Sequence, residues 1–136
     1  MKNSFLLRTS PLSADLAALL LRLIIGGMFT YHGYLKIENY NTYMPMMQDI
    51  IGIGSKLSYN LVILAEFGCG LLVTLGFLTR LTILPILVSM IIAYFIAHKN
   101  DAFMMKMLPF VYMWLCLPVF VLGSGRWSVD RLLFKR

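Results

Sequence analysis

Four long apolar runs, at about 16–36, 57–79, 81–98 and 107–123, alternate with short polar segments along the chain. A helix that crosses the hydrocarbon core of a bilayer needs ~17–25 mostly apolar residues, and each run meets that length. The pattern therefore predicts an all-α membrane protein, a four-transmembrane-helix bundle with a short interfacial helix between helices one and two. We expect residues 1–136 to form a single transmembrane domain, because the connecting segments leave no room for a soluble one.

The second run carries a carboxylate, Glu66, near its middle, among the small residues Ala65, Gly68, Cys69 and Gly70. An ionisable side chain at that depth is costly unless it is paired, protonated or hydrated. We therefore predict that Glu66 faces the interior of the bundle, where other polar groups can meet it.

Polar and small residues form one stripe along the first helix: Arg22, Gly26, Phe29, Gly33 and Lys36 recur every three or four positions. Glycines on such a stripe let a neighbouring helix approach closely. Arg22 either snorkels to the headgroups or points inward as a buried cation, and its place beside the two glycines favours the inward position.

The connecting segments predict three further features. Apolar positions at Tyr43, Met46, Met47, Ile50 and Ile51 indicate an interfacial helix of about two turns, with Pro45 in its first turn and Gly52 and Gly54 at its end. Residues 79–82 predict a tight turn between helices two and three. Ser128 is placed to begin a short surface helix.

Composition and charge define the class of protein and its orientation. The chain is 60% hydrophobic with a net charge of +6. The basic residues cluster at helix ends, which is typical of membrane topology signals and argues against nucleic-acid binding. Seven basic residues lie on the side of the termini and of the 79–82 turn, and four lie on the opposite side. The positive-inside rule then places both termini in the cytoplasm. We expect a multi-pass protein of a bacterial-type inner membrane.

Polar groups within the spans separate into an outer and an inner set. The outer set holds Glu66, His32 and His98, and the inner set holds arginines with Asp15 and Asp130. A carboxylate and an imidazole at one depth can relay protons. We expect a pocket lined by His32, Glu66, Tyr94 and His98, with Tyr31 or Tyr34 nearby. For His32, with a tyrosine on each side, a plain interfacial position stays equally open.

In the inner set, opposite charges share one membrane depth. We expect Asp15 or Asp130 to pair with Arg22, Arg80 or Arg126 and to tie the C-terminal segment to the bundle. Neither Cys69 nor Cys116 lies in a C-x-x-C motif, so both are expected to be packing residues.

Several motifs together resemble the DoxX family. They are Arg22-Leu-x-x-Gly26, His32-Gly33-x-x-Lys36, Glu66-x-Gly68-x-Gly70 running into Leu75-Gly76-x-x-Thr79-Arg80, and Gly123-x-Gly125-Arg-x-Ser128-x-Asp130. The resemblance covers nearly the whole chain in order. It implies a four-helix membrane bundle, and it implies a place among membrane subunits such as those of thiosulfate:quinone oxidoreductase or of other redox and oxidative-stress assemblies.

These observations predict a membrane subunit of a redox system, with a quinone as the possible cofactor and redox proteins or a second copy of the chain as possible partners beside the lipid bilayer. Glu66, His32 and His98 would move protons, and the cofactor-binding residues would be Tyr31, Tyr34, Tyr94, Arg22 and Arg80, with a structural or anion-binding role open for the two arginines. We expect no metal site. The sequence holds no haem pair, iron–sulfur spacing or nucleotide motif, so an electron carrier would be a quinone or lie on a partner protein. A non-catalytic membrane scaffold and a small proton-coupled transporter stay open as alternatives.

Overall fold

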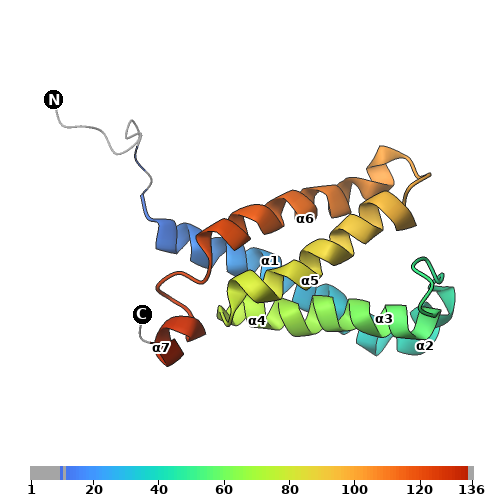
Figure 1. The fold of residues 1–136 in the computed structure, drawn as a ribbon, viewed down its shortest axis with the longest axis horizontal. Helices are drawn as coiled ribbons and strands as arrows, with labels where there is room; N and C mark the ends of the chain where they lie inside the picture. Colours follow the sequence, from blue (N-terminus) through green and yellow to red (C-terminus); the bar gives the residue numbers. More distant parts are fainter. Residues whose placement is uncertain (1–9, 11, 135–136) are drawn as a thin grey trace.

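The computed structural model describes residue 10 and residues 12–134. Within this part of the chain, four helices are long and apolar enough to cross a membrane. The first is α1 (Ala14–Glu38), and the second runs without a break through α3 (Ser55–Ile63), η3 (Leu64–Cys69) and α4 (Gly70–Leu75). The third joins α5 (Thr79–Ile92) to η4 (Ala93–Ala97), and the fourth is α6 (Phe103–Leu122). The predicted all-α four-span bundle is confirmed (Figure 1).

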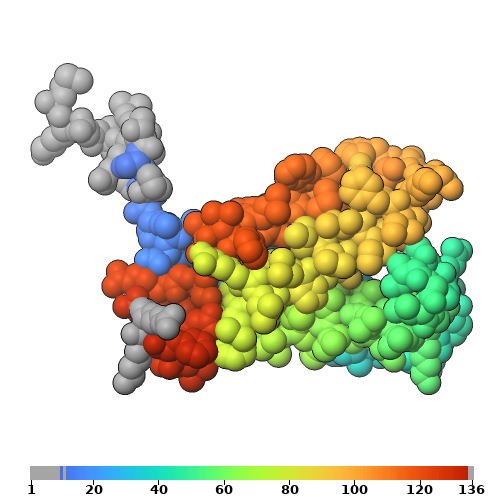
Figure 2. Space-filling model, viewed as in Figure 1, coloured from blue at the N-terminus to red at the C-terminus, as the bar shows by residue number. Residues whose placement is uncertain are grey.

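Two ends of the bundle are distinguished by their connections. The start of α1 and the short helix α7 (Val129–Phe134) lie at one end, which we call the terminal end (Figure 1). The opposite end, the loop end, holds the α1–α3 connection and the α5–α6 hairpin (Figure 1). The ends of α5 and α6 diverge there from α3, and the space-filling view is notched between them (Figure 2).

The first helix and the second span approach each other more closely than ordinary side chains allow. A Cβ added at Gly33 would lie 2.4 Å from the backbone nitrogen of Phe67, and one at Gly70 would lie 2.8 Å from that of Thr30. A Cβ at Gly26 would meet the Thr74 hydroxyl at 2.4 Å. The glycines of the predicted stripe therefore let the two backbones touch, as small residues do between membrane helices.

The apolar core lies between α1, α4, α5 and α6. Its fully buried members include Ile25, Val73, Ile83, Ile86 and Cys116. Large apolar side chains are exposed along all four spans, among them Leu64, Leu81, Trp114 and Val121. In a membrane protein this surface contacts lipid, because lipid tails are as apolar as the side chains themselves.

Two spans contain a turn of π-helix. The segments are η3 in the second span and η4 in the third. A π-helical turn inserts one residue into the helix and often occurs at functional sites. In this bundle both segments contribute residues to the same cavity, described below.

The connections differ from the predictions in detail. The turn between the second and third spans is at Gly76–Leu78, and α5 already begins at Thr79. Gly76 and Leu78 both have positive φ, 74° and 46°, so the chain reverses before residue 79. The interfacial helix is also shorter and earlier than expected.

The helical part of that connection is α2 (Tyr40–Tyr43) followed by a 3-10 turn, η2 (Met44–Met46). Pro45 lies in the 3-10 turn, and residues 47–54 are not helical. The Asp49 carboxylate accepts a hydrogen bond from the Ile53 backbone and so stabilises a loop there. Gly52 and Gly54 have φ of 75° and 94°, outside the helical region.

The starts of α1 and α7 have side-chain caps. The Ser13 hydroxyl accepts a hydrogen bond from the Leu16 backbone and caps α1. The Ser128 hydroxyl accepts one from the Arg131 backbone, and α7 follows it as predicted. Four of the basic residues counted for orientation, Lys2, Arg8, Lys135 and Arg136, lie outside the described residues.

Candidate functional site

A cavity of about 310 Å³ opens between the spans toward the loop end. It is lined by all four spans and by the segment after η2. Its polar members are His32, Lys36, Glu66, His98 and Tyr112. Its apolar members include Phe29, Met47, Ile50, Val62 and Met90. A few polar groups converging in an apolar cleft of this size is the usual composition of a ligand site in a helical bundle.

An ion pair joins α1 to η3 at this cavity. The Lys36 ammonium donates to the Glu66 carboxylate, with Nζ and Oε2 2.5 Å apart. The Glu66 side chain is 7% exposed and that of Lys36 is 28% exposed. Lys36 lies one turn beyond Gly33, which contacts Phe67, the neighbour of Glu66. The close helix contact at Gly33 therefore brings the lysine within reach of the carboxylate.

The end of α1 is held against α3 by two tyrosines. The Tyr59 hydroxyl donates to the Lys36 carbonyl at 3.0 Å, and the Tyr40 hydroxyl donates to the Asn60 side chain at 2.9 Å. The two rings stack edge to face with centroids 5.3 Å apart. This contact fixes the backbone that carries Lys36, so the ammonium is positioned before any ligand binds.

His32 presents a buried ring nitrogen at the cavity. Its Nε2 is inaccessible to solvent and has no hydrogen-bond partner among the described residues. The ring meets Tyr112 of α6 edge to face, with centroids 6.4 Å apart, and Tyr112 packs on Phe29 at 4.9 Å. A buried polar atom without a partner is uncommon in folded proteins and indicates a place for a ligand or water.

His98 lies at the mouth of the cavity, where the third span ends. Its Nδ1 is 2.7 Å from the carboxylate of Asp101 in the following loop. Both side chains are more than a third exposed. The imidazole therefore lies between the cavity and the exposed surface of the loop end.

The structure brings together His32, Glu66 and His98 as expected, but it places the predicted tyrosines elsewhere. Tyr94 is not among the cavity-lining residues; its ring packs on Phe95 and Phe110, with the Lys106 ammonium 5.2 Å from its centroid. Tyr31 and Tyr34 are 56% and 49% exposed on the other face of α1. They border a shallow pocket with Phe67 and Leu71 instead.

Arg22 and Arg80 lie at the terminal end, away from this cavity. Arg22 is 1% exposed and donates from Nη2 to the Trp127 carbonyl at 2.6 Å. A Cβ at Gly76 would overlap its Nη1, so the missing side chain leaves room for the guanidinium. Arg80 donates to the carbonyls of Phe120 and Val121, at 3.1 and 3.2 Å. Arg80 thus binds the backbone of the last turn of α6, and Arg22 binds the backbone of the segment that follows α6.

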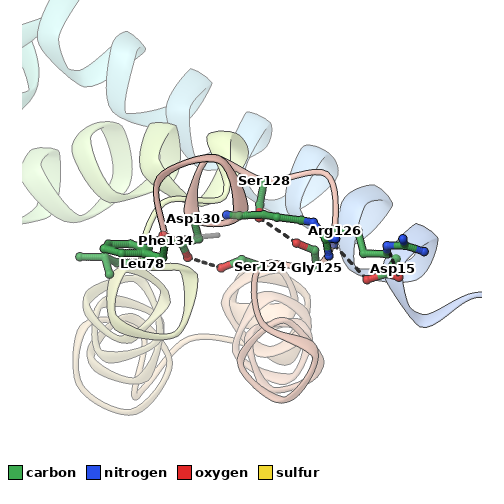
Figure 3. Close-up of a pocket in the computed structure, with 9 residues that line it drawn as sticks. Asp15, Leu78, Ser124, Gly125, Arg126, Ser128, Asp130 and Phe134 are labelled. Carbon is green, nitrogen blue, oxygen red and sulfur yellow. Dashed lines mark hydrogen bonds and ion pairs between the residues drawn. The ribbon is translucent and has the colours of Figure 1, made fainter. Parts of the chain in front are cut away.

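The carboxylates of the terminal end bind the C-terminal segment (Figure 3). Asp15 accepts a hydrogen bond from the Arg126 backbone at 3.0 Å and lies 4.0 Å from its side chain. The predicted pairing is thereby confirmed for Asp15. Asp130 instead accepts from the Leu78 backbone at 2.9 Å and from the Ser124 hydroxyl. No arginine in the described part of the chain forms an ion pair with Asp130.

Sequence reasoning missed two polar residues of the cavity. Lys36 was not expected there or as the partner of Glu66, although its place on the stripe with Gly33 was a signal that it faces the second span. Tyr112 lies in a uniformly apolar helix whose buried face could not be assigned from its pattern. The cavity thus combines an ammonium, a carboxylate, two imidazoles and a phenol in an apolar enclosure. Such a set can donate hydrogen bonds to a carbonyl compound and exchange protons with it.

Comparison with known proteins decides the family. The DoxX family model matches residues 17–99, which is more than half of the chain. The chain belongs to the DoxX family. Inner membrane protein YqjF of Escherichia coli (strain K12) is 34% identical over 126 residues, covering 90% of this chain and 95% of YqjF. Membrane protein Rv3486 of Mycobacterium tuberculosis (strain ATCC 25618 / H37Rv) is 30% identical over 139 residues, covering 85% of this chain and 80% of Rv3486. No solved structure matches the chain.

The matched DoxX region contains most of the cavity's polar side chains. His32, Lys36, Glu66 and His98 all fall within residues 17–99, whereas Tyr112 of α6 lies beyond them. The first three spans of this DoxX chain therefore contribute the ion pair and both imidazoles to the cavity, and the fourth span contributes the aromatic ring of Tyr112.

Proposed function

We propose that this DoxX protein is the membrane subunit of a redox system and binds the head group of a quinone in the cavity between its spans. The observation that carries the proposal is the set of His32, Lys36 and Glu66 at one apolar cavity, with His32 Nε2 buried and unpaired in the described structure. A quinone head is a flat apolar ring with carbonyl oxygens at opposite edges. It fits an apolar cleft with hydrogen-bond donors on separate walls.

The donor set matches the carbonyl chemistry. The Lys36 ammonium has three N–H donors, of which one is used by Glu66, and His32 supplies a ring nitrogen. The two residues lie one turn apart on α1, and both line the cavity. Met90, Ile50 and Phe29 provide the apolar surface against which the flat ring would pack.

Proton supply follows from the same residues. Reduction of a quinone to a quinol consumes two electrons and two protons. The Lys36 ammonium donates a hydrogen bond to Glu66 at the cavity, and His98 lies with Asp101 at the solvent-exposed opening. Carboxylates and imidazoles can be tuned by their surroundings to take up or release protons near neutral pH. The electrons would come from a partner redox protein docked at the membrane surface.

Location and orientation belong to the same proposal. One relative is an inner membrane protein by name, and we propose the inner membrane for this chain also. In the sequence, seven basic residues fall on the side of the termini and four on the opposite side, which favours a cytoplasmic position for both termini.

The test is binding of a short-chain quinone to the purified protein in mild detergent, measured by calorimetric titration. We expect saturable binding that is weakened at least about tenfold by His32→Ala and by Lys36→Met, the loss expected when a charge-assisted or buried hydrogen bond is removed. Tyr34→Phe on the opposite face of α1 is the matched control and should bind like the wild type. Absence of binding, or equal binding by all variants, would contradict the proposal.

A further inference from the structure

A second cavity adjoins the polar one and is almost entirely apolar. Its volume is about 410 Å³, within the ~300–1,000 Å³ range of small-molecule sites. The two cavities share four lining residues: Met47, Ile50, Val62 and Ile92. The two cavities are therefore neighbours, and these four residues border both of them. The segment that follows η2 covers both of them.

The apolar cavity faces the bilayer, whereas the polar one reaches into the bundle. It lies between the second and third spans, with Ala65 and Ser89 on its opposing walls. Leu61, Leu64 and Val88 also line it and are 46%, 62% and 52% exposed on the lipid-facing surface. A hydrocarbon chain can therefore pass from the bilayer into this cavity without crossing a polar surface.

We propose that the apolar cavity holds the first part of the prenyl tail of a membrane quinone whose head occupies the polar cavity. This inference rests on the proposed function. The occupant follows from this adjacency: a molecule with one polar ring and one long apolar chain matches a polar cavity that shares lining residues with an apolar cavity facing lipid. The rest of the tail would lie among lipid chains beside α3 and α5.

The site thereby favours membrane-resident quinones that enter laterally. The apolar chain is transferred from lipid and not from water, so its binding in the cavity depends on van der Waals packing against the lining side chains. A side chain that fills the cavity should exclude the tail by steric overlap and leave the head site untouched. This separates the tail subsite from the head subsite experimentally.

The experiment compares a benzoquinone without a side chain with the same head carrying a prenyl chain. Ser89→Phe fills the apolar cavity, since Ser89 lines it and not the polar one. We expect Ser89→Phe to weaken binding of the prenyl quinone at least about tenfold, as overpacking typically does, and to leave the tail-free quinone unchanged. Ile91→Phe, on the same helix outside both cavities, is the matched control and should bind both compounds like the wild type.

The outcomes distinguish the two proposals. Equal binding of the prenyl quinone by Ser89→Phe and wild type would overturn the tail subsite alone. Failure of the wild type to bind the tail-free quinone would overturn the head site and with it the proposed function. In the unaltered protein, a prenyl quinone with a photoreactive group near the start of its tail should label residues 58–65 or 85–92. Labelling of this cavity by a photoreactive phospholipid chain that excess prenyl quinone does not displace would assign it to lipid and overturn the inference.

Discussion

The Lys36 ammonium and the Glu66 carboxylate, on two different helices, form an ion pair inside the bundle, with Nζ and Oε2 2.5 Å apart. The pair accounts for the presence of a carboxylate in the middle of an apolar span, because an intramembrane charge is tolerated when it is paired. It also links α1 to the second span at the cavity.

Replacing one partner of the ion pair should lower the free energy of unfolding more than replacing both partners. In Lys36→Met the buried Glu66 loses its partner, and we expect the free energy of unfolding to fall by about 3 kcal/mol. In Lys36→Met/Glu66→Leu no charge is left uncompensated, so the loss should be smaller than for Lys36→Met alone. Reversible unfolding in mixed detergent micelles measures both. Losses that simply add in the double variant would show that the two groups do not interact.

Close backbone contact predicts a sharp difference between two glycines of α1. A Cβ at Gly33 would lie 2.4 Å from the backbone of Phe67, whereas a Cβ at Gly27 would meet nothing within 4 Å. We expect Gly33→Ala to destabilise the bundle by about 1–3 kcal/mol through overpacking. Gly27→Ala should be neutral or stabilising by up to ~1 kcal/mol, because alanine favours helix. Similar melting temperatures for the two variants would contradict the close approach.

The buried Arg22 should hold the C-terminal segment in place. Its guanidinium donates to the Trp127 carbonyl, a bond worth about 1.5–3 kcal/mol for a charged donor. In Arg22→Met we expect amide hydrogen exchange in residues 126–131 to become at least about tenfold faster. Arg126→Met is the control, since its side chain is 66% exposed and 4.0 Å from Asp15, where an ion pair contributes little. Unchanged amide hydrogen exchange in Arg22→Met would show that Arg22 does not hold the C-terminal segment in place.

Orientation is testable by cysteine labelling. In a background with both native cysteines replaced by alanine, Asn100→Cys should react with a membrane-impermeant reagent added to intact cells. Trp127→Cys, at the terminal end, should react only after the membrane is permeabilised. The reverse pattern would place both termini outside, contrary to the distribution of basic residues.

The fold was predictable because each span carries its own signal. Span length and the glycine stripe of α1 both depend on residues close together in the chain, and each was confirmed. The turn at Gly76–Leu78 was placed a few residues late, because only the structure shows that Leu78 adopts positive φ.

The site was predictable only in part, because it depends on the rotation of each helix about its axis. His32, Glu66 and His98 share one depth, which the sequence shows, and they also share one cavity. Depth alone could not tell Tyr112, which lines the cavity, from Tyr94, which packs on Phe110 beside it. The partner of Glu66 depended on how closely α1 approaches η3, and so on Gly33.

The most direct test of the quinone site is to locate a bound head group by covalent labelling. A quinone with a photoreactive azide on its ring is irradiated with the purified protein, and the labelled peptides are identified by mass spectrometry. The account predicts labels on cavity-lining positions of α1, α3 or α6, such as Phe29, Val62 or Leu108, which disappear when excess unlabelled quinone is present. Labels confined to the Tyr31–Tyr34 face or to the terminal end, or labels that excess quinone does not reduce, would contradict it.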